Sequence, residues 1–318
     1  MKKSLIALAA LAATGAFAQS SVTLSGQLDV GYQKAIGSAA DAAQTETHGS
    51  RVRLLGTEDL GGGLKASFNL EHRLNLKNGG NSGFAASAPT NGLNQDTFWN
   101  GTSTVGLSGS FGTVDMGRQY TAGFISANNK ADPFGGDGVG ALRGVGMRTT
   151  NNNGTLRVAQ SIGYKNSFGP VSLHVTSGDE IGTGATQRAL GYAIGFTQGA
   201  ISAGFGKDSG AMGDEVTNAY AGYNFGFANV TLGYGKTGGS LAKTTGMLVG
   251  VTVPVAGGTV KAGYATAENA AGVKTNNKFG VGYSYDLSKR TRIDLTAGND
   301  SKLTANKSGY DVTLTHSF

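Results

Sequence analysis

The arginines of this sequence are spaced so that several could lie together and bind anions. Arg51 and Arg53 lie on the polar side of a segment of alternating polar and apolar residues, and Arg73 lies on the polar side of the next such segment. Arg157 follows a long polar segment, residues 124–154. A guanidinium stays charged at any physiological pH and binds carboxylates and phosphates through paired N–H groups. The pattern indicates fixed positive charges that meet anions; the alternative for each arginine is a solvated side chain without special effect.

The groups needed for enzyme chemistry do not come together in the sequence. The absence of cysteine excludes disulfides, thiolate metal sites, iron–sulfur clusters and a cysteine nucleophile. The four histidines stand singly, none at a metal-ligand spacing, and no Gly-x-Ser-x-Gly motif occurs. Residues 233–238 match a dinucleotide-binding fingerprint in form, but they end an alternating strand and no helix follows. We therefore expect no enzyme, no cofactor and no metal site.

Composition and charge exclude further classes of protein. The chain has 318 residues, of which 39% are hydrophobic, and this argues against disorder. Its 54 glycines have no three-residue period, so a collagen is excluded. The net charge is +6, but no basic run is longer than two residues, so we expect no nucleic-acid partner.

The first 18 residues have the pattern of a secretory signal peptide. Lys2 and Lys3 precede a short apolar run, and residues 16–18 read Ala-Phe-Ala, a small-residue cleavage pattern. The alternative is a membrane anchor, but the apolar run is shorter than the ~20 residues that a spanning helix needs. We expect an exported chain whose residues 19–318 form one domain.

The elements that position the arginines are strands. From residue 22 to residue 32 the large apolar residues occupy the even positions and polar residues the odd ones, and residues 310–318 repeat this alternation. Seven tight-turn signals alternate with eight longer polar segments, which predicts sixteen strands. The turns lie near 59–62, 110–112, 167–170, 198–199, 226–228, 256–258 and 287–289, and the longer segments near 36–49, 76–100, 124–154, 179–187, 207–214, 237–244, 267–277 and 299–308.

One continuous apolar face and one continuous polar face predict a closed barrel in a membrane. Closing the sheet with its apolar side toward lipid satisfies every backbone group, and the polar side then encloses water. Aromatic residues near strand ends are expected at the membrane interfaces, with ordinary β-propensity as the alternative. These are Tyr32, Tyr120, Tyr164, Phe168, Tyr192, Phe227 and Tyr234. The fold class predicted is an all-β, sixteen-stranded antiparallel transmembrane β-barrel.

An ordered set of motifs over the whole mature chain resembles the Gram-negative general porins, in particular the betaproteobacterial ones. The motifs are SVTLSGQLDVG (21–31), SRVRLLGTEDLG (50–61), FGTVDMGRQY (111–120), DPFGGD (132–137) and the terminal Phe318. The resemblance implies a homotrimer in the outer membrane, in contact with lipid and lipopolysaccharide, whose third loop folds inward. It also implies that Phe318 is a signal for the barrel assembly machinery.

The resemblance further implies a pore constriction with acidic residues on the inner loop and basic residues on the facing wall. Asp132 and Asp137 are the loop carboxylates; Pro133 and Asn129 stand where related porins have acidic residues. The basic residues expected at the constriction are Arg51, Arg53, Arg73, Arg143, Arg148 and Arg157. Arg118 resembles a position used in subunit contacts, and its parity with Val114 and Met116 points it outward.

These charges predict what would cross such a pore. Charges on a narrow ring bordered by lipid are poorly screened, so retained arginines and fewer carboxylates favour anions. We expect passive diffusion of small hydrophilic solutes and small anions. The alternatives are a substrate-specific channel and a barrel that serves mainly as a surface adhesin.

Overall fold

The computed structural model describes residues 20–81, 98–147, 156–179 and 187–318. Arg148 and the expected signal peptide (1–18) lie outside the described residues. The strands are β1 (Ser21–Lys34), β2 (Ala43–Thr45), β3 (Arg51–Gly61), β4 (Leu64–Arg73), β5 (Ser103–Gly109), β6 (Gly112–Tyr120), β7 (Arg157–Phe168), β8 (Val171–Gly178), β9 (Ala189–Gln198), β10 (Ile201–Ser209), β11 (Asp214–Asn224), β12 (Asn229–Gly239), β13 (Thr244–Val255), β14 (Gly258–Asn269), β15 (Lys274–Asp286), β16 (Thr291–Asp300) and β17 (Ser308–Ser317). The helical segments are η1 (Phe124–Asn128), α2 (Asn129–Ala131) and α3 (Arg143–Gly146).

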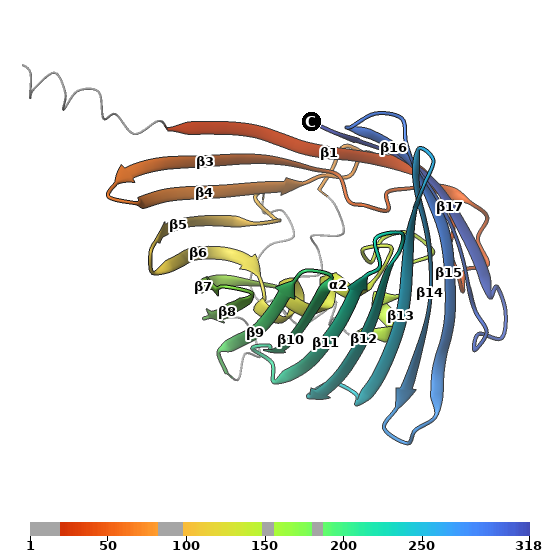
Figure 1. Ribbon diagram of the computed structural model, residues 1–318. Helices are drawn as coiled ribbons and strands as arrows, with labels where there is room; N and C mark the ends of the chain where they lie inside the picture. The colour runs from red at the N-terminus through yellow and green to blue at the C-terminus, as the bar shows by residue number, and fades with distance from the viewer. Residues whose placement is uncertain (1–19, 82–97, 148–155, 180–186) are drawn as a thin grey trace, which may run out of the picture.

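The strands form one closed antiparallel barrel (Figure 1). From β3 onward each strand pairs with the next in sequence, β3 also pairs with β1, and β1 pairs with β17 to close the sheet. The three-residue β2 pairs with residues 31–33 of β1, and β3 pairs with residues 21–27 of the same strand. Both therefore lie along one edge of β1, and together they occupy one position in the wall. The described residues therefore make a barrel of sixteen positions, as predicted, and all seven predicted tight turns connect strands.

The alternation of the sequence sets the two faces of the wall. On β17, Tyr310 and Leu314 are 52% and 46% exposed on the outer face, whereas Asp311 and Thr313 are 2% and 1% exposed on the inner face. A side chain in a strand points opposite to its neighbours, so the period of two in the sequence becomes a lipid-facing side and a lumen-facing side. Within the described residues, no helix has the length and hydropathy of a membrane-spanning helix.

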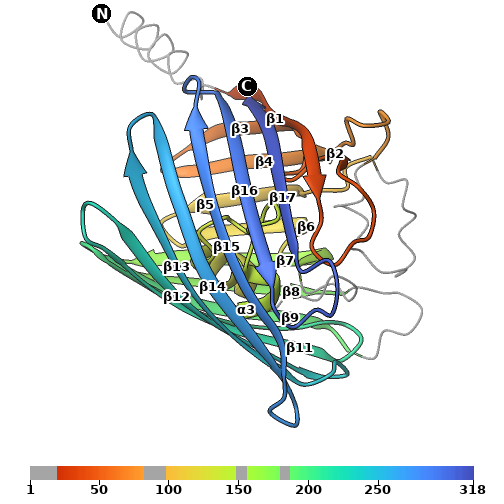
Figure 2. The ribbon, with the colours of Figure 1, turned by 90° about the vertical axis from the view of Figure 1, so that its right-hand side faces the viewer.

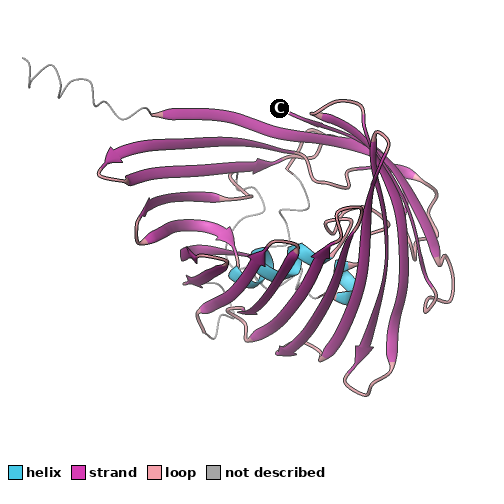
Figure 3. Cartoon of the chain, viewed as in Figure 1, coloured by secondary structure: helices cyan, strands magenta, loops and turns pink. Residues whose placement is uncertain are grey.

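The segment between β6 and β7 folds into the barrel. Its three helical segments lie inside the ring of strands (Figures 2 and 3). At its start, the Asp208 carboxylate on β10 accepts hydrogen bonds from Gly123 N and the Thr121 hydroxyl, each 2.9 Å long. Further along, Val139 N donates to Asp311 on β17, and Gly140 N donates to the Thr296 hydroxyl on β16 at 3.1 Å. The described part of this inner loop (residues 121–147) is thus fixed to the wall at both ends.

Glycines on the wall, which have no side chain, leave room for the inner loop. A Cβ on Gly280 would lie 2.2 Å from the carbonyl oxygen of Gly140, and one on Gly246 would lie 2.3 Å from that of Val145. The remaining contact is apolar, with a buried cluster made of Ala131, Phe134, Leu142, Met147, Leu248 and Ala265. Loop and wall therefore pack as a small core inside the lumen, which leaves the opposite wall to face the open space.

Candidate functional site: an arginine cluster in the lumen

Glu71 on β4 is the centre of a group of arginines. The register places Glu71 opposite Arg53 of β3, and the Arg53 Nε donates to the carboxylate at 2.6 Å. Arg73 Nε donates to the other oxygen at 2.7 Å, and an Arg157 nitrogen lies 3.6 Å from that oxygen. Glu71 is 2% exposed, and Arg157 is 5% exposed. One buried carboxylate thus holds three guanidinium groups from three strands.

Tyr120 at the end of β6 completes the cluster. Its hydroxyl accepts hydrogen bonds from Arg73, at 3.1 Å, and from Arg157. The Arg157 guanidinium carbon lies 3.9 Å from the centre of the Tyr120 ring, a cation–π contact. The ring also stacks on Phe124 of the inner loop, with the centroids 5.0 Å apart. The expectation that Tyr120 lies at a membrane interface is therefore wrong, because its ring packs on the inner loop.

Arg51, the first residue of β3, has no carboxylate within ion-pair distance among the residues that the structure describes. It lies opposite Arg73 on the neighbouring strand, a like-charge pair that Glu71 helps to compensate. Arg51 donates to the Gln27 side-chain oxygen at 2.9 Å and to the carbonyl oxygens of His48 and Gly49 at 3.2 Å each. Its charge therefore stays available to a solute.

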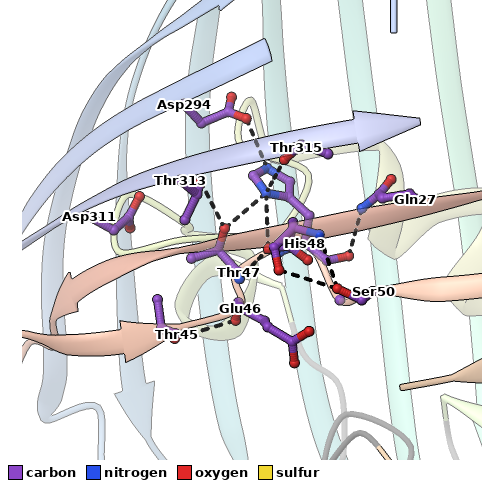
Figure 4. A network of polar contacts seen from close by, with 12 residues as sticks. Gln27, Thr45, Glu46, Thr47, His48, Ser50, Asp294, Asp311, Thr313 and Thr315 are labelled. Carbon is purple, nitrogen blue, oxygen red and sulfur yellow. Dashed lines mark hydrogen bonds and ion pairs between the residues drawn. The ribbon is translucent and has the colours of Figure 1, made fainter. Parts of the chain in front are cut away.

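The carbonyls that hold Arg51 belong to an inward bulge between β2 and β3. Residues 46–50 oppose only residues 28–30 of β1, so two extra residues are accommodated and the bulge turns into the lumen (Figure 4). Asp29 Oδ2 accepts hydrogen bonds from Thr47 N at 2.7 Å and His48 N at 2.9 Å. The backbone N–H of Asp29 in turn donates to the Ser50 hydroxyl at 3.0 Å. Asp29 is fully buried and fixes the bulge.

The far end of the bulge reaches the strands at the carboxyl end of the chain. Thr47 donates to the Thr313 hydroxyl at 3.2 Å, and His48 Nε2 lies 3.5 Å from Asp294 (Figure 4). Burial lowers the pKa of His48 to about 4, although the charge of Asp294 favours protonation. The ring is therefore neutral at pH 7 and adds no charge to the lumen.

Replacing Asp29 by asparagine is expected to loosen the bulge. The amide oxygen of asparagine can still accept both N–H groups, but it carries no charge, so both hydrogen bonds become weaker, at a cost of about 1–3 kcal/mol in the free energy of unfolding. Denaturation of the refolded protein in detergent micelles measures this loss. Asp41→Asn, which changes an exposed aspartate of the same loop, is the control. An Asp29→Asn protein as stable as Asp41→Asn would contradict the assignment.

The two aspartates expected at the constriction occupy different environments. Asp132 is 7% exposed and its oxygens accept hydrogen bonds from the backbone N–H groups of Phe134, Leu142 and Arg143 at 2.7–2.9 Å. The Asp132 carboxylate therefore binds the backbone of its own loop, whereas it was expected to face the pore. Asp137 is only half-buried. Burial still raises its pKa to about 7, although the charges of Arg143 and Arg51 favour its ionised form.

Arg143 is the arginine of the inner loop that the structure describes. Its guanidinium donates to the Asn129 side chain and to the Gly135 carbonyl, the latter at 2.9 Å. Its guanidinium carbon lies 5.1 Å from the centre of the Phe124 ring. Phe124 thus contacts Arg143 as well as Tyr120 of the arginine cluster.

Arg118 and Phe318 are bonded to groups other than Glu71. Arg118 is opposite Ser103 on β5, and its Nε donates to the Asn100 carbonyl at 3.1 Å. Phe318 exchanges two backbone hydrogen bonds with Gly26 of β1, at 2.9 and 3.1 Å. The last residue of the chain therefore extends the pairing that closes the barrel.

The structure brings Arg51, Arg53, Arg73 and Arg157 to one side of the lumen, and sequence reasoning missed what binds them. Glu71 shares the polar side of its strand with Arg73, two residues on, and this is the signal that could have identified it. Four guanidinium groups accompany one carboxylate, so the group carries a net positive charge. A cavity of about 460 Å³ is lined by Arg53, Glu71 and Tyr120, so the Arg53 side of the group faces open space while Arg73 and Arg157 are buried behind it.

Comparison with known proteins places the chain in a family. The Gram-negative porin model matches residues 4–304. The chain is 36% identical to outer membrane porin protein 32 of Delftia acidovorans, over 92% of this chain and 88% of that protein. It is 28% identical to an outer membrane porin protein of Bordetella pertussis, over 92% of each chain.

Solved structures agree with this result. The anion-selective porin from Comamonas acidovorans aligns with a TM-score of 0.74 and 28% identity, over 94% of this chain and all of that one. A trimer form of OmpT from Vibrio cholerae aligns with a TM-score of 0.66 and 14% identity, over 94% of this chain and 99% of that one, which shows the shared fold alone. With a closed sixteen-position barrel and a polar lumen, the chain belongs to the Gram-negative porin family and is a non-enzymatic channel of the outer membrane.

Proposed function

We propose that this porin prefers anions and that the arginine cluster is the part of its constriction that selects them. The observation that carries the proposal is the excess of guanidinium groups around the single Glu71 carboxylate in the lumen. Such charges act strongly because the surrounding lipid is a poor dielectric and the opening is narrow. The similar Comamonas protein is described as anion-selective, which supports the same function for this chain.

The inner loop supplies the other side of the proposed constriction. It packs on the wall of β10–β17 through hydrogen bonds to Asp208, Thr296 and Asp311, while the arginines come from β3, β4 and β7. Solutes would pass between the two. The loop contributes the charges of Asp137 and Arg143, and that of Asp137 changes with pH because its pKa is raised to about 7. Asp132 instead stabilises the conformation of the loop. Binding must remain weak, because a tightly held anion would block the pore.

Reversal potentials in a salt gradient test this function. The purified protein in a planar bilayer, with potassium chloride at two concentrations, is expected to give a potential of the sign set by chloride. A potential set by potassium would refute the anion preference while leaving a conducting porin. The absence of any conductance would refute the open pore itself.

The proposed constriction predicts a pH dependence that passes through Asp137. With its pKa raised to about 7, this carboxyl is neutral at pH 5 and negative at pH 9. The anion-to-cation permeability ratio is therefore expected to fall about twofold to fivefold between pH 5 and pH 9, since one added charge at ~4 Å in water contributes about 1 kcal/mol. Asp137→Asn should keep the pH 5 ratio throughout. If the variant shows the same fall, another group is responsible and the assignment fails.

Further properties of the chain are proposed from the family. We propose a homotrimer in which Arg118 contributes to subunit contacts, surrounded by outer-membrane lipid and lipopolysaccharide. Phe318 is proposed as the recognition signal for the barrel assembly machinery, and residues 1–18 as a cleaved signal peptide. Crosslinking of the detergent-extracted protein tests the trimer, and amino-terminal sequencing of the mature protein tests the cleavage site.

A further inference from the structure

A second polar cavity lies near the tight turns of the barrel, apart from the arginine cluster. It has a volume of about 660 Å³, and its lining includes glycines of the β3–β4 and β5–β6 turns. Three lysines line it from three different elements: Lys65 of β4, Lys130 of α2 in the inner loop, and Lys165 of β7. The inner loop and the wall thus both contribute positive charge to one space.

The positive charge of this cavity is only partly compensated. Lys165 lies 3.2 Å from a carboxylate oxygen of Asp115. Asp59 lies opposite Lys65 in the register of β3 and β4, but no carboxylate of the described residues lies within 4.0 Å of the ammonium group of Lys65 or Lys130. Both side chains are exposed to the lumen side of the cavity rather than buried. Two ammonium groups are therefore available to a solute in the same cavity.

Neutral hydrogen-bonding groups complete the lining. The hydroxyls of Thr113, Ser172 and Thr197 border the cavity. His174 lies directly opposite Lys165 on the neighbouring strand and is 4% exposed. Its Nε2 is buried and has no hydrogen-bond partner among the residues that the structure describes. A buried polar atom without a partner at the edge of a polar cavity is a place where a bound ion or water is expected.

The cavity continues the path from the arginine cluster. Lys165 and Ile125 line both this space and the cavity beside Arg53 and Glu71. A solute that leaves the arginines toward the tight-turn end therefore meets the lysines next. The two groups of positive charge are in series along the lumen.

We propose that the Lys65–Lys130 cavity is a transient binding site for small anions that carry two negative charges, such as a short dicarboxylate. Because both lysines line one cavity, a divalent anion long enough to span it would pair with both ammonium groups, whereas a monovalent anion pairs with one. Exposed ion pairs in water are weak, so the site retains the anion briefly and releases it. This inference rests on the proposed function, because only a conducting pore delivers anions to the cavity.

Saturation of the single-channel conductance tests the site. Conductance is measured in increasing potassium succinate, which is divalent at pH 8, and in potassium acetate as the monovalent reference. Succinate conductance is expected to saturate at lower concentration than acetate conductance. Lys65→Gln with Lys130→Gln should raise the half-saturating succinate concentration about threefold for each lysine, the change that one exposed ion pair produces. Acetate values should change less.

Lys289→Gln is the matched control. Lys289 is exposed in the β15–β16 turn at the same end of the barrel, and it does not line the cavity. Lys65→Gln alone leaves α2 and the rest of the inner loop unchanged. An effect of this single variant on the half-saturating concentration is therefore due to the lost charge and not to a disturbed loop. An unchanged half-saturating concentration in both the single and double variants would overturn the site while leaving the pore intact. Loss of all conductance in the wild-type protein would instead refute the proposed function.

Discussion

Replacing Arg51 and Arg157 together by glutamine is expected to remove most of the anion preference of the pore. The lost Arg51 guanidinium removes about 1 kcal/mol of attraction for an anion at ~4 Å in water, which corresponds to about fivefold in the permeability ratio. The loss of the buried Arg157 adds to this effect by lowering the net positive charge of the cluster. Reversal potentials in a salt gradient measure the change. The conductance itself should persist, and the free energy of unfolding of the double variant is measured beside it, because Arg157 also belongs to the buried network of Glu71 and Tyr120.

These two arginines are the informative pair because their charges are used differently from those of the others. Arg51 is bonded to an amide oxygen and two carbonyls, and Arg157 stacks on the Tyr120 ring with Glu71 only at 3.6 Å. Arg188→Gln is the control, since Arg188 is paired with Asp179 and its side chain is 73% exposed. A double variant with the selectivity of Arg188→Gln would show that the cluster does not govern permeation.

Glu71→Gln is expected to have the largest effect on stability. The carboxylate is buried among three guanidinium groups, and removing one partner of a buried charged network typically costs about 3–5 kcal/mol. The free energy of unfolding, measured in detergent micelles, should fall accordingly. The anion preference should rise in the same variant, because the positive charges remain and their counter-charge is gone.

The opposite signs of these two changes separate a specific role from general damage. A merely distorted barrel would lose selectivity along with stability. Glu58→Gln removes the same charge from an exposed position on the adjacent strand β3 and should leave both quantities unchanged. A Glu71→Gln protein with unchanged stability would contradict the assignment of Glu71 as the centre of the cluster.

The wall of the barrel could be predicted from sequence because its determinants are local. Alternation of polar and apolar residues sets the faces, and turn residues set the strand ends, so Arg53 and Arg73 could be assigned to the polar side without a structure. The inward direction of Tyr120 could not be predicted in this way. The register between β6 and β7 shifts between Gly117 and Gln119, and Gln160 on the paired strand adopts a φ of 50° there. Because of this bulge, alternation counted from Met116 does not give the direction of Tyr120.

Contacts between distant segments were equally beyond the sequence. The inward bulge at 46–50 depends on Asp29, and nothing in the spacing of these residues announces their hydrogen bonds. Asp132 shows the same limit: its residue type fits a pore carboxylate, yet backbone N–H groups of its own loop occupy its oxygens. Residue type predicted charge, while the partners of each charge depended on tertiary structure.

The anchors of the bulge and of the inner loop have a consequence for the order of assembly. The bulge that holds Arg51 is fixed between β1, at the start of the chain, and Asp294 and Thr313 near its end. The inner loop likewise reaches Asp311 on the final strand. A nascent barrel whose first and last strands have not yet met therefore lacks part of the support for the bulge and for the inner loop. The proposed constriction would be complete only after closure, although the Glu71 cluster on β3, β4 and β7 does not depend on it.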